Sequence, residues 1–274
     1  VPYPLANTLT EEFPEVTHAT TMGLLHGIKV KKEENYIRDD GFFCADSNFF
    51  QVFTVQGLRG NPQQWLKGPD QVVLTRTMAE KYFGSLEVLD QKISVKFGDS
   101  ERLLNISGVI DDWPSNSSLQ MNFLASLDFY LEVFPQMLLS TGKHQITPEF
   151  LKSSWDVELF LSYLKVKDGF EQEAFAGKLR DLEKRKLRES GKTLYHLQPM
   201  DDIYFHSADF KSGFTQRGDL KQVFIFSVVA LLIVIVACIN YILLSSSQAL
   251  DRAREVGIRK ISGATRKTLF HQVL

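Results

Sequence analysis

The stretch that decides how this chain is organised is Val223–Leu244, which reads VFIFSVVALLIVIVACINYILL. Only Ser227 and Asn240 in it are clearly polar, and no charged residue occurs between Lys221 and Asp251. At a rise of about 1.5 Å per residue, a helix over this stretch is roughly 33 Å long, enough to cross a hydrocarbon core of about 30 Å. A helix of this length in a soluble protein would keep a polar stripe. The sequence therefore predicts one transmembrane helix at 223–244.

The charges that follow this stretch predict its orientation. Between Asp251 and Lys267 the acids Asp251 and Glu255 are outnumbered by basic residues. These are Arg252, Arg254, Arg259, Lys260, Arg266 and Lys267. Because positive residues beside a span stay on the cytoplasmic side, we expect the C-terminal end to be cytoplasmic and the residues before 222 to lie outside the cytoplasm.

The rest of the chain has the composition of an ordinary water-exposed domain. The 274 residues have a formal net charge of -2, and no basic stripe precedes the span, so nothing indicates nucleic-acid binding. Residues 1–220 are enough for one or two small domains with real cores. Val1 begins directly in polar, proline-containing sequence, so we expect the chain to be a segment of a longer protein.

Short strand and helix patterns alternate in this outer part. Strands are predicted at 71–75, 92–97, 103–110, 159–167 and 193–200, and helices at 76–83 and 171–189. In the last helix Phe175, Leu179 and Leu182 form an apolar stripe, and Phe49, Phe50 and Phe53 have helical spacing. Residues 131–148, which contain two prolines and a glycine, are expected to form a loop. The sequence thus predicts a mixed α+β domain.

No catalytic or metal-binding pattern stands out. The 6 histidines show no metal-ligand spacing, and SGATRKT at 262–268 lacks the spacing of a phosphate-binding loop. The acidic pairs Asp111-Asp112 and Asp201-Asp202 are interpreted as solvated turn acids or helix caps rather than acid/base pairs. We therefore expect no enzymatic activity, cofactor or metal. Asn240 either hydrogen bonds a neighbouring transmembrane helix or lies near the interface, and both alternatives stay open.

Residues 249–267, ALDRAREVGIRKISGATRK, resemble the first cytoplasmic stretch of MacB/FtsX-type permeases of ABC transporters. The matching residues are Arg252, Arg254, Glu255, Gly257, Ile258, Arg259, Lys260, Gly263 and Ala264. The segments SNFFQVFTVQGLRGNP, VVLTRTMAEKYFG and NISGVIDDWPSNSS resemble, in order, the periplasmic core domain of the same family. LQPMDDIYF and ACINYILLSSSQA resemble its Bacteroidetes-type branch.

This resemblance implies an architecture. It implies a periplasmic domain at 1–220 made of strand-helix-strand units, with a small mixed α/β subdomain inserted at 46–112. After the transmembrane helix at 223–244, it implies a cytoplasmic amphipathic coupling helix within 245–274. The location implied is the bacterial inner membrane.

The resemblance also implies a function. The chain would be a permease subunit that transmits the ATP-driven motion of a separate ATPase subunit to the periplasm, for export or mechanotransmission. The nine matching residues would couple to the ATPase. Asn240 is a candidate for transmembrane packing because it is a polar side chain within the span, not through the resemblance. Implied partners are that ATPase, a second permease copy or half forming a dimer, a periplasmic adaptor and membrane lipid. The alternative from another class is a single-pass receptor whose outer domain binds a ligand.

Overall fold

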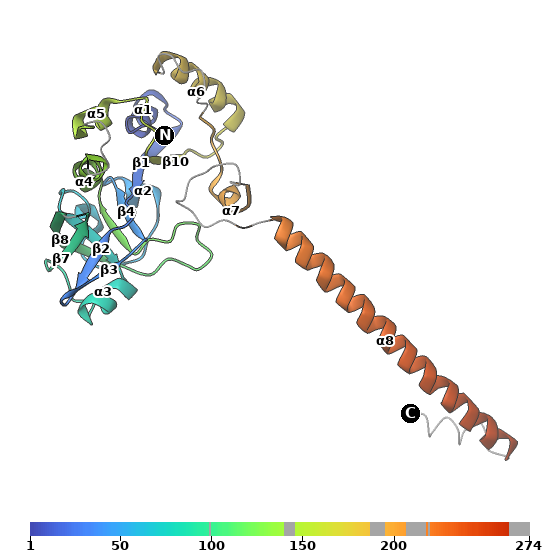
Figure 1. Ribbon diagram of the computed structural model, residues 1–274. Coiled ribbons are helices and arrows are strands. Elements are labelled where there is room, and N and C mark those ends of the chain that lie inside the picture. Colours follow the sequence, from blue (N-terminus) through green and yellow to red (C-terminus); the bar gives the residue numbers. More distant parts are fainter. Residues whose placement is uncertain (99, 140–145, 187–194, 207–217, 219, 263–274) are drawn as a thin grey trace. The chain divides into compact units, whose positions relative to one another are not determined.

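The computed structural model describes residues 1–98, 100–139, 146–186, 195–206, 218 and 220–262. The chain divides into two compact units, Val1–Arg217 and Gly218–Leu274. The first is a mixed α+β domain, as the sequence predicted, and the second contains one long helix (Figure 1).

The first unit is organised around one 10-stranded sheet. The strand order is β10-β1-β4-β9-β6-β8-β7-β2-β3, with β5 paired to β8 off this path. The strands are β1 (Val16–Leu24), β2 (Lys29–Lys32), β3 (Asn35–Arg38), β4 (Phe42–Ala45), β5 (Gly57–Arg59), β6 (Gln71–Thr75), β7 (Lys92–Phe97), β8 (Ser100–Ile110), β9 (Phe123–Ser126) and β10 (Leu161–Val166). Two neighbouring pairs, β4 with β9 and β6 with β8, are parallel, and the other pairs are antiparallel.

Both faces of the central strands are buried, because successive side chains of a strand point to opposite faces. In β4, Phe42 and Cys44 join one hydrophobic cluster, while Phe43 and Ala45 join the other. Leu124 in β9 packs with the second pair. This explains why the central strands read as short continuous apolar runs rather than as alternating ones.

Helices cover the two faces. The helices of the first unit are α1 (Leu5–Glu12), α2 (Phe49–Val52), η1 (Pro62–Gln64), α3 (Arg76–Phe83), α4 (Leu127–Leu139), α5 (Pro148–Ser153), α6 (Gln172–Lys186), η2 (Met200–Asp202) and α7 (Ile203–His206). α3, α4 and α5 bury Met78, Tyr130 and Leu151 in the first cluster. On the opposite face α2 buries Phe49 beside Trp65.

A third cluster joins α1 and α6 to the start of β1. Phe175, Leu179 and Leu182 of α6 are buried against Leu9 and Phe13, so the predicted apolar stripe is confirmed. The predicted α3 is also confirmed, and it ends at Gly84, whose φ of 70° is the left-handed conformation that glycine favours.

Two expectations were wrong in the described residues. Residues 131–139 belong to α4 rather than to a loop. Pro135 removes one backbone donor from this helix, but the burial of Leu131 and Val133 outweighs that loss. Residues 140–145 of the expected loop lie outside the described residues.

The strand expected at 193–200 does not form where the structure describes it, at residues 195–200. Side chains of α6 satisfy that backbone instead of a strand partner. The Tyr195 N–H donates to the Glu183 carboxylate, and Gln172 Nε2 donates to the Leu197 carbonyl at 2.9 Å. Pro199 also lacks an N–H, which weakens any ladder there.

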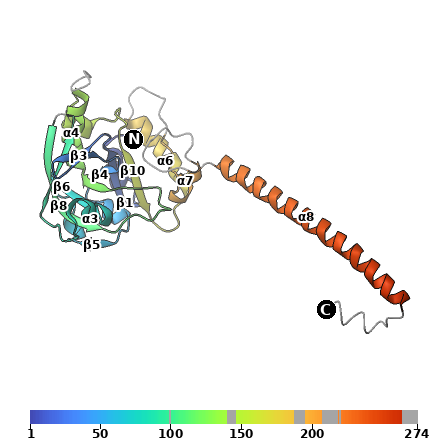
Figure 2. The same ribbon diagram turned by 60° about the horizontal axis from the view of Figure 1, so that its bottom comes forward.

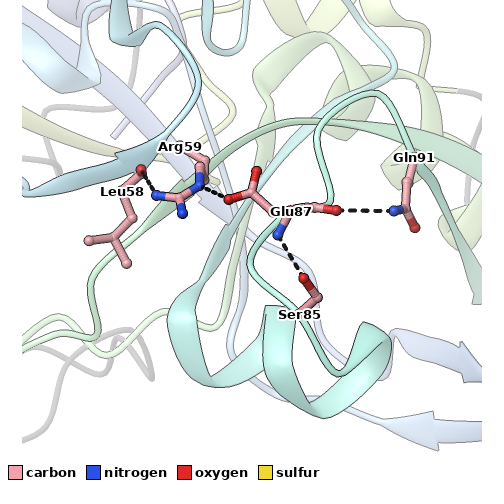
Figure 3. Close-up of polar contacts among 5 residues, drawn as sticks. All are labelled: Leu58, Arg59, Ser85, Glu87 and Gln91. Carbon is pink, nitrogen blue, oxygen red and sulfur yellow. Dashed lines mark hydrogen bonds and ion pairs between the residues drawn. The ribbon is translucent and has the colours of Figure 1, made fainter.

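Polar contacts connect the segment after α3 to β5 (Figure 3). Arg59 Nε donates to Glu87 Oε1 at 2.5 Å, and Arg59 Nη1 donates to the Leu58 carbonyl at 2.8 Å. Ser85 Oγ accepts from the Glu87 N–H, and Gln91 Nε2 donates to the Glu87 carbonyl. Glu87 is therefore held through both its side chain and its backbone.

Candidate functional site

The second unit contains α8 (Leu220–Ile261), a helix of 42 residues that runs without a break (Figure 2). It is long and apolar enough to cross a membrane, with a mean hydropathy of 3.0 in its most apolar window. It is the one such helix among the described residues. Ser227 lies in the apolar part, where its hydroxyl donates to the Val223 carbonyl at 2.8 Å. This bond satisfies the hydroxyl without a partner helix.

The candidate coupling residues lie in the last turns of the same helix. Arg252, Arg254, Glu255, Gly257, Ile258, Arg259 and Lys260 all belong to α8. The structure thus joins the predicted span and the predicted coupling helix into one element. Gly263 and Ala264 lie outside the described residues.

These turns are amphipathic. Leu250, Ile258 and Ile261 are 73%, 59% and 90% exposed, and helical spacing places them near Ala253 and Gly257 on one side. We call this set of five residues the coupling stripe. Leu250 and Ile261 are not among the residues that matched by resemblance. Their spacing of i, i+3, i+7, i+8 and i+11 in the sequence is the signal that could have identified them.

Charged side chains lie on the other side of these turns. Asp251, Glu255 and Arg259 are four residues apart in sequence and so share one side. Glu255 Oε1 accepts from Arg259 Nη2 at 3.4 Å. Arg254 differs from them, because it lies four residues after Leu250 and four before Ile258, within the coupling stripe. An apolar stripe that contains a basic group is suited to binding another protein surface.

Gly257 lies within the coupling stripe, and a Cβ added there would meet nothing within 4 Å in the described structure. The glycine is therefore not required by packing against the described residues. Its small size leaves the helix backbone accessible to a close neighbour. The described helix ends one residue before Ser262, whose hydroxyl donates to the Ile258 carbonyl at 3.1 Å.

In the outer domain Asp46 connects β4 to β1. Its carboxylate accepts from the Thr20 hydroxyl and the Thr21 N–H, each at 2.8 Å, and from the Asn48 N–H at 3.0 Å. Burial raises the pKa of Asp46 above its ordinary value, and these hydrogen bonds oppose that rise. Asp46 is thus a structural anchor rather than a reactive acid.

The first acidic pair adjoins α3. Asp111 Oδ1 accepts from Arg76 Nε at 3.0 Å, and the Arg76 guanidinium lowers the pKa of Asp111. Asp112 accepts from the backbone N–H and the hydroxyl of Thr77. Of the two alternatives predicted for this pair, solvated turn acid or helix cap, the cap is found for Asp112, whereas Asp111 forms an ion pair with Arg76. The second pair, Asp201-Asp202, lies in the single turn η2.

The described residues contain no group of three or more His, Cys, Asp or Glu side chains that could hold a metal ion. A small pocket between the end of β10 and α6 is lined by Gly169, Phe170 and Phe175. The Lys178 ammonium pairs with the Glu15 carboxylate at its edge. The pair neutralises both of these charges, and Glu171 is the other charged residue of the lining.

A mixed α+β domain followed by a long, exposed, apolar helix defines a class of protein, namely a membrane-anchored protein with an extracytoplasmic domain. The family model for the MacB-like periplasmic core domain matches residues 1–182. The chain belongs to this family, whose members are components of transporter permeases. The predicted family and fold class are therefore confirmed.

Solved structures with this fold include a domain of a putative permease protein from Porphyromonas gingivalis. It is 22% identical with a TM-score of 0.55, and the match covers 73% of this chain and 86% of that one. The periplasmic region of MacB from Actinobacillus actinomycetemcomitans is 16% identical, with a TM-score of 0.49 and coverages of 76% and 82%. The extracellular domain of the noncanonic ABC-type transporter YknZ from Gram-positive bacteria is 12% identical, with a TM-score of 0.46 and coverages of 73% and 89%. No curated protein matches the chain.

Proposed function

We propose that this chain is the permease subunit of a MacB/FtsX-type ABC transporter, and that α8 transmits ATP-driven motion of a separate ATPase subunit to the outer domain. The observation that carries the proposal is the continuity of α8, which extends from the apolar span to Ile261 as one helix. A continuous helix resists bending, so displacement of one end moves the other.

The length of α8 supports this role. At about 1.5 Å per residue, the part beyond Leu244 extends roughly 25 Å past the end of the predicted span. The coupling stripe thus begins about 9 Å beyond Leu244, just past the lipid headgroups, and ends about 25 Å beyond it. A helix that served only as an anchor would need no ordered, amphipathic extension of this length.

The chemistry of the extension supports a protein partner. Leu250, Ile258 and Ile261 are exposed in the described structure, and Arg254 lies among them on the same side of the helix. Burial of such side chains in a partner's groove gives affinity, while the basic groups select an acidic rim. We therefore assign the coupling stripe and Arg254 to the ATPase contact.

The remaining assignments complete the proposal. Residues 1–220 form the periplasmic domain with a subdomain inserted at 46–112, 223–244 cross the inner membrane, and 245–274 are cytoplasmic. A second permease copy or half completes a dimer, in which Asn240 hydrogen bonds across the transmembrane helices. A periplasmic adaptor and membrane lipid are the other partners.

Co-purification of the full chain with its cognate ATPase from detergent tests the proposal. Charge reversal at both Arg254 and Arg259 should abolish recovery of the ATPase. Arg254→Glu places a carboxylate within the coupling stripe, and Arg259→Glu reverses a basic charge on the other side of the helix and breaks its pair with Glu255. An Ile258→Asp variant should do the same without changing a basic residue. The matched control is Lys184→Glu, a charge reversal on α6 where the side chain is solvent-exposed and pairs only weakly with Asp181.

Unchanged recovery of the ATPase with all three α8 substitutions would refute the docking role. Loss of recovery with the Lys184→Glu control as well would mean that charge reversal acts through folding. A chain that never recovers an ATPase, and whose outer domain instead binds a ligand, would favour the single-pass receptor.

A further inference from the structure

One end of the sheet has a basic, solvent-facing surface. Lys29 and Lys31 in β2 and Lys92 in β7 are exposed, and Lys96 in β7 is half-buried. The residues between them, such as Val30 and Val95, are buried in the first hydrophobic cluster. Alternation along the strands therefore places all four lysines on the opposite face. We call these residues the lysine face.

Tyr36 of the edge strand β3 adjoins the lysine face, and its ring lies near two of the lysines. Tyr36 pairs with Lys31 between β3 and β2. On the other side of β2, Lys29 pairs with Lys96 of β7. The ammonium groups of Lys31 and Lys96 lie 5.9 and 5.8 Å from the Tyr36 ring centroid. Two cations over one ring hold the surface in a defined geometry.

The face carries few compensating acids. Glu101, opposite Lys96, accepts hydrogen bonds from Ser94 Oγ at 2.5 Å and from the Tyr36 side chain. The turn between β2 and β3 contributes Glu33 and Glu34 at the tip. In the described part of the chain, Lys29 and Lys92 have no ion-pair partner, so their charges are available.

An apolar residue adjoins these charges. Leu103 in β8 pairs with Ser94 and is 55% exposed. A basic surface with a tyrosine and an exposed leucine has the composition of a protein interface. A surface that only bound a diffuse anion would need no such apolar group.

The lysine face ends at an open sheet edge. β3 is the last strand in the order, and among the described strands only β2 pairs with it. The Asp39 N–H donates to the Ile28 carbonyl. In an antiparallel pair only every second residue bonds the neighbouring strand, so the backbone groups of Ile37 and Asn35 also bond β2. The backbone groups of Tyr36 and Arg38 therefore point to the open edge, and no described residue bonds them.

We propose that this edge is the docking site for an extended acidic segment of a partner protein, which adds as a strand beside β3. Its backbone pairs with Tyr36 and Arg38, and its carboxylates at alternate positions face the lysine face. Arg38 already pairs with Asp40, but this pair is exposed and exchanges easily. The proposal does not depend on the ATPase contact of α8.

A polypeptide fits this site better than an anionic lipid or a polysaccharide. Only a polypeptide can use both the open backbone groups and the charges. β2 lies about 10 Å from an added strand, and a glutamate and a lysine together bridge that gap. Arg38 on the edge strand and the lysines on the neighbouring strands repel basic strands, so these charges make the edge selective for acidic ones.

Binding of synthetic peptides to the full chain in nanodiscs of zwitterionic lipid tests the proposal. The probe is a labelled peptide with glutamate at every second position and valine or threonine between, followed by fluorescence polarisation. A second peptide has lysine in place of glutamate. A third keeps the acidic sequence but carries N-methyl groups on the amides that would pair with β3.

The double variant Lys29→Glu/Lys31→Glu should bind the acidic peptide at least about ten-fold more weakly than the unaltered chain. Lys29→Gln/Lys31→Gln should give a smaller loss. The matched control is Lys165→Glu/Lys167→Glu at β10, the opposite edge of the sheet, which should change binding by less than about two-fold. N-methylation should weaken binding by about ten-fold or more, because it removes the strand hydrogen bonds.

Four results would overturn the proposal. They are no binding of the acidic peptide, equal binding of the lysine peptide, equal binding of the N-methylated peptide, or equal loss in the β10 control. Binding of anionic phosphatidylglycerol vesicles that depends on Lys29 and Lys31, without binding of the peptide, would instead assign the face to lipid. The thermal unfolding midpoint of each variant is also measured. Equal midpoints show that a change in peptide binding does not come from a change in folding.

Discussion

Asp112, two residues beyond the end of β8, caps α3 by accepting hydrogen bonds from Thr77 at both its backbone N–H and its hydroxyl, at 3.0 and 2.8 Å. The residue at the usual capping position, Thr75, makes no side-chain cap of its own. A backbone N–H in the first turn of α3 is thus bonded by a residue far along the sequence. This links the stability of α3 to its contact with β8.

Replacing Asp112 by alanine should therefore destabilise the outer domain by about 1 kcal/mol, the usual value for loss of a helix cap. Asp112→Asn keeps an acceptor and should cost less. The chain's 3 tryptophans, Trp65, Trp113 and Trp155, all lie in the first unit, so urea unfolding followed by tryptophan fluorescence reports this domain. Equal midpoints for Asp112→Ala and the unaltered chain would contradict the capping role.

A second prediction concerns the contact between Trp65 and Gly108. A Cβ added at Gly108 would lie 2.2 Å from Trp65 Nε1, and Trp65 is buried. Gly108→Ala should therefore destabilise the outer domain by about 2 kcal/mol or more, because the added methyl overlaps a buried indole ring that would have to shift.

Gly177→Ala is the matched control for this substitution. Gly177 lies inside α6, and a Cβ there meets nothing within 4 Å. The same chemical change should stabilise the domain by roughly 0.5–1 kcal/mol, because alanine is the better helix former. If both variants shift the urea midpoint in the same direction, the proposed contact does not control the effect.

These two glycines illustrate what the sequence could and could not predict. The elements with strong local signals, such as β6 and α3, could be predicted almost to the residue, because turn residues and periodicity fix them. The close approach of Trp65 to Gly108 could not, since it joins positions that only the tertiary fold brings together. The strand expected at 193–200 failed for the same reason, because side chains of α6 take its backbone hydrogen bonds.

The functional features also separate into those that local sequence predicts and those that depend on the tertiary fold. The span and the residues that follow it could be predicted from hydropathy and charge, which are local properties. The lysine face could not, because Tyr36 and Lys96 are distant in sequence and meet only through the pairing of β2 with β3 and β7. The open edge at β3 likewise depends on the complete strand order.

A third prediction follows from the pair of Arg76 and Asp111. The guanidinium lowers the pKa of Asp111 below its ordinary value of 3.8. A carboxyl with a lowered pKa in the folded state contributes stability above the ordinary pKa, and this contribution disappears as the pH falls through the folded pKa. Lys178 lowers the pKa of Glu15 below 4.5 with the same sign.

The outer domain should accordingly lose stability as the pH falls below about 4.5. Asp111→Asn should lower the urea midpoint at pH 7 and make the midpoint less dependent on pH in the acid range. The pKa of Asp46 shifts in the opposite direction, because burial raises it. Asp46→Asn should therefore not make the urea midpoint less dependent on pH in the acid range. If the urea midpoint of Asp111→Asn depends on acid pH as strongly as that of the unaltered chain, the assigned role of the pair is contradicted.

The last prediction tests whether α8 acts as a rigid connection, which the proposed function requires. Inserting alanines between Ser246 and Ser247 lengthens the helix beyond the predicted span and rotates the coupling stripe. Two alanines rotate it by about 200° and lengthen the helix by about 3 Å, whereas four rotate it by about 400°, close to one full turn, and lengthen it by about 6 Å.

If the ATPase contact depends on the direction of the coupling stripe, the longer insertion should do less damage than the shorter one. Substrate-independent ATPase activity of the co-purified complex in nanodiscs provides the measurement, and circular dichroism verifies that both insertions remain helical. A flexible connection would tolerate both insertions equally, and a role for length alone would make four alanines worse than two. Only a rigid, phase-dependent helix predicts that four alanines preserve more coupling than two, because rotation of the stripe then outweighs the added length.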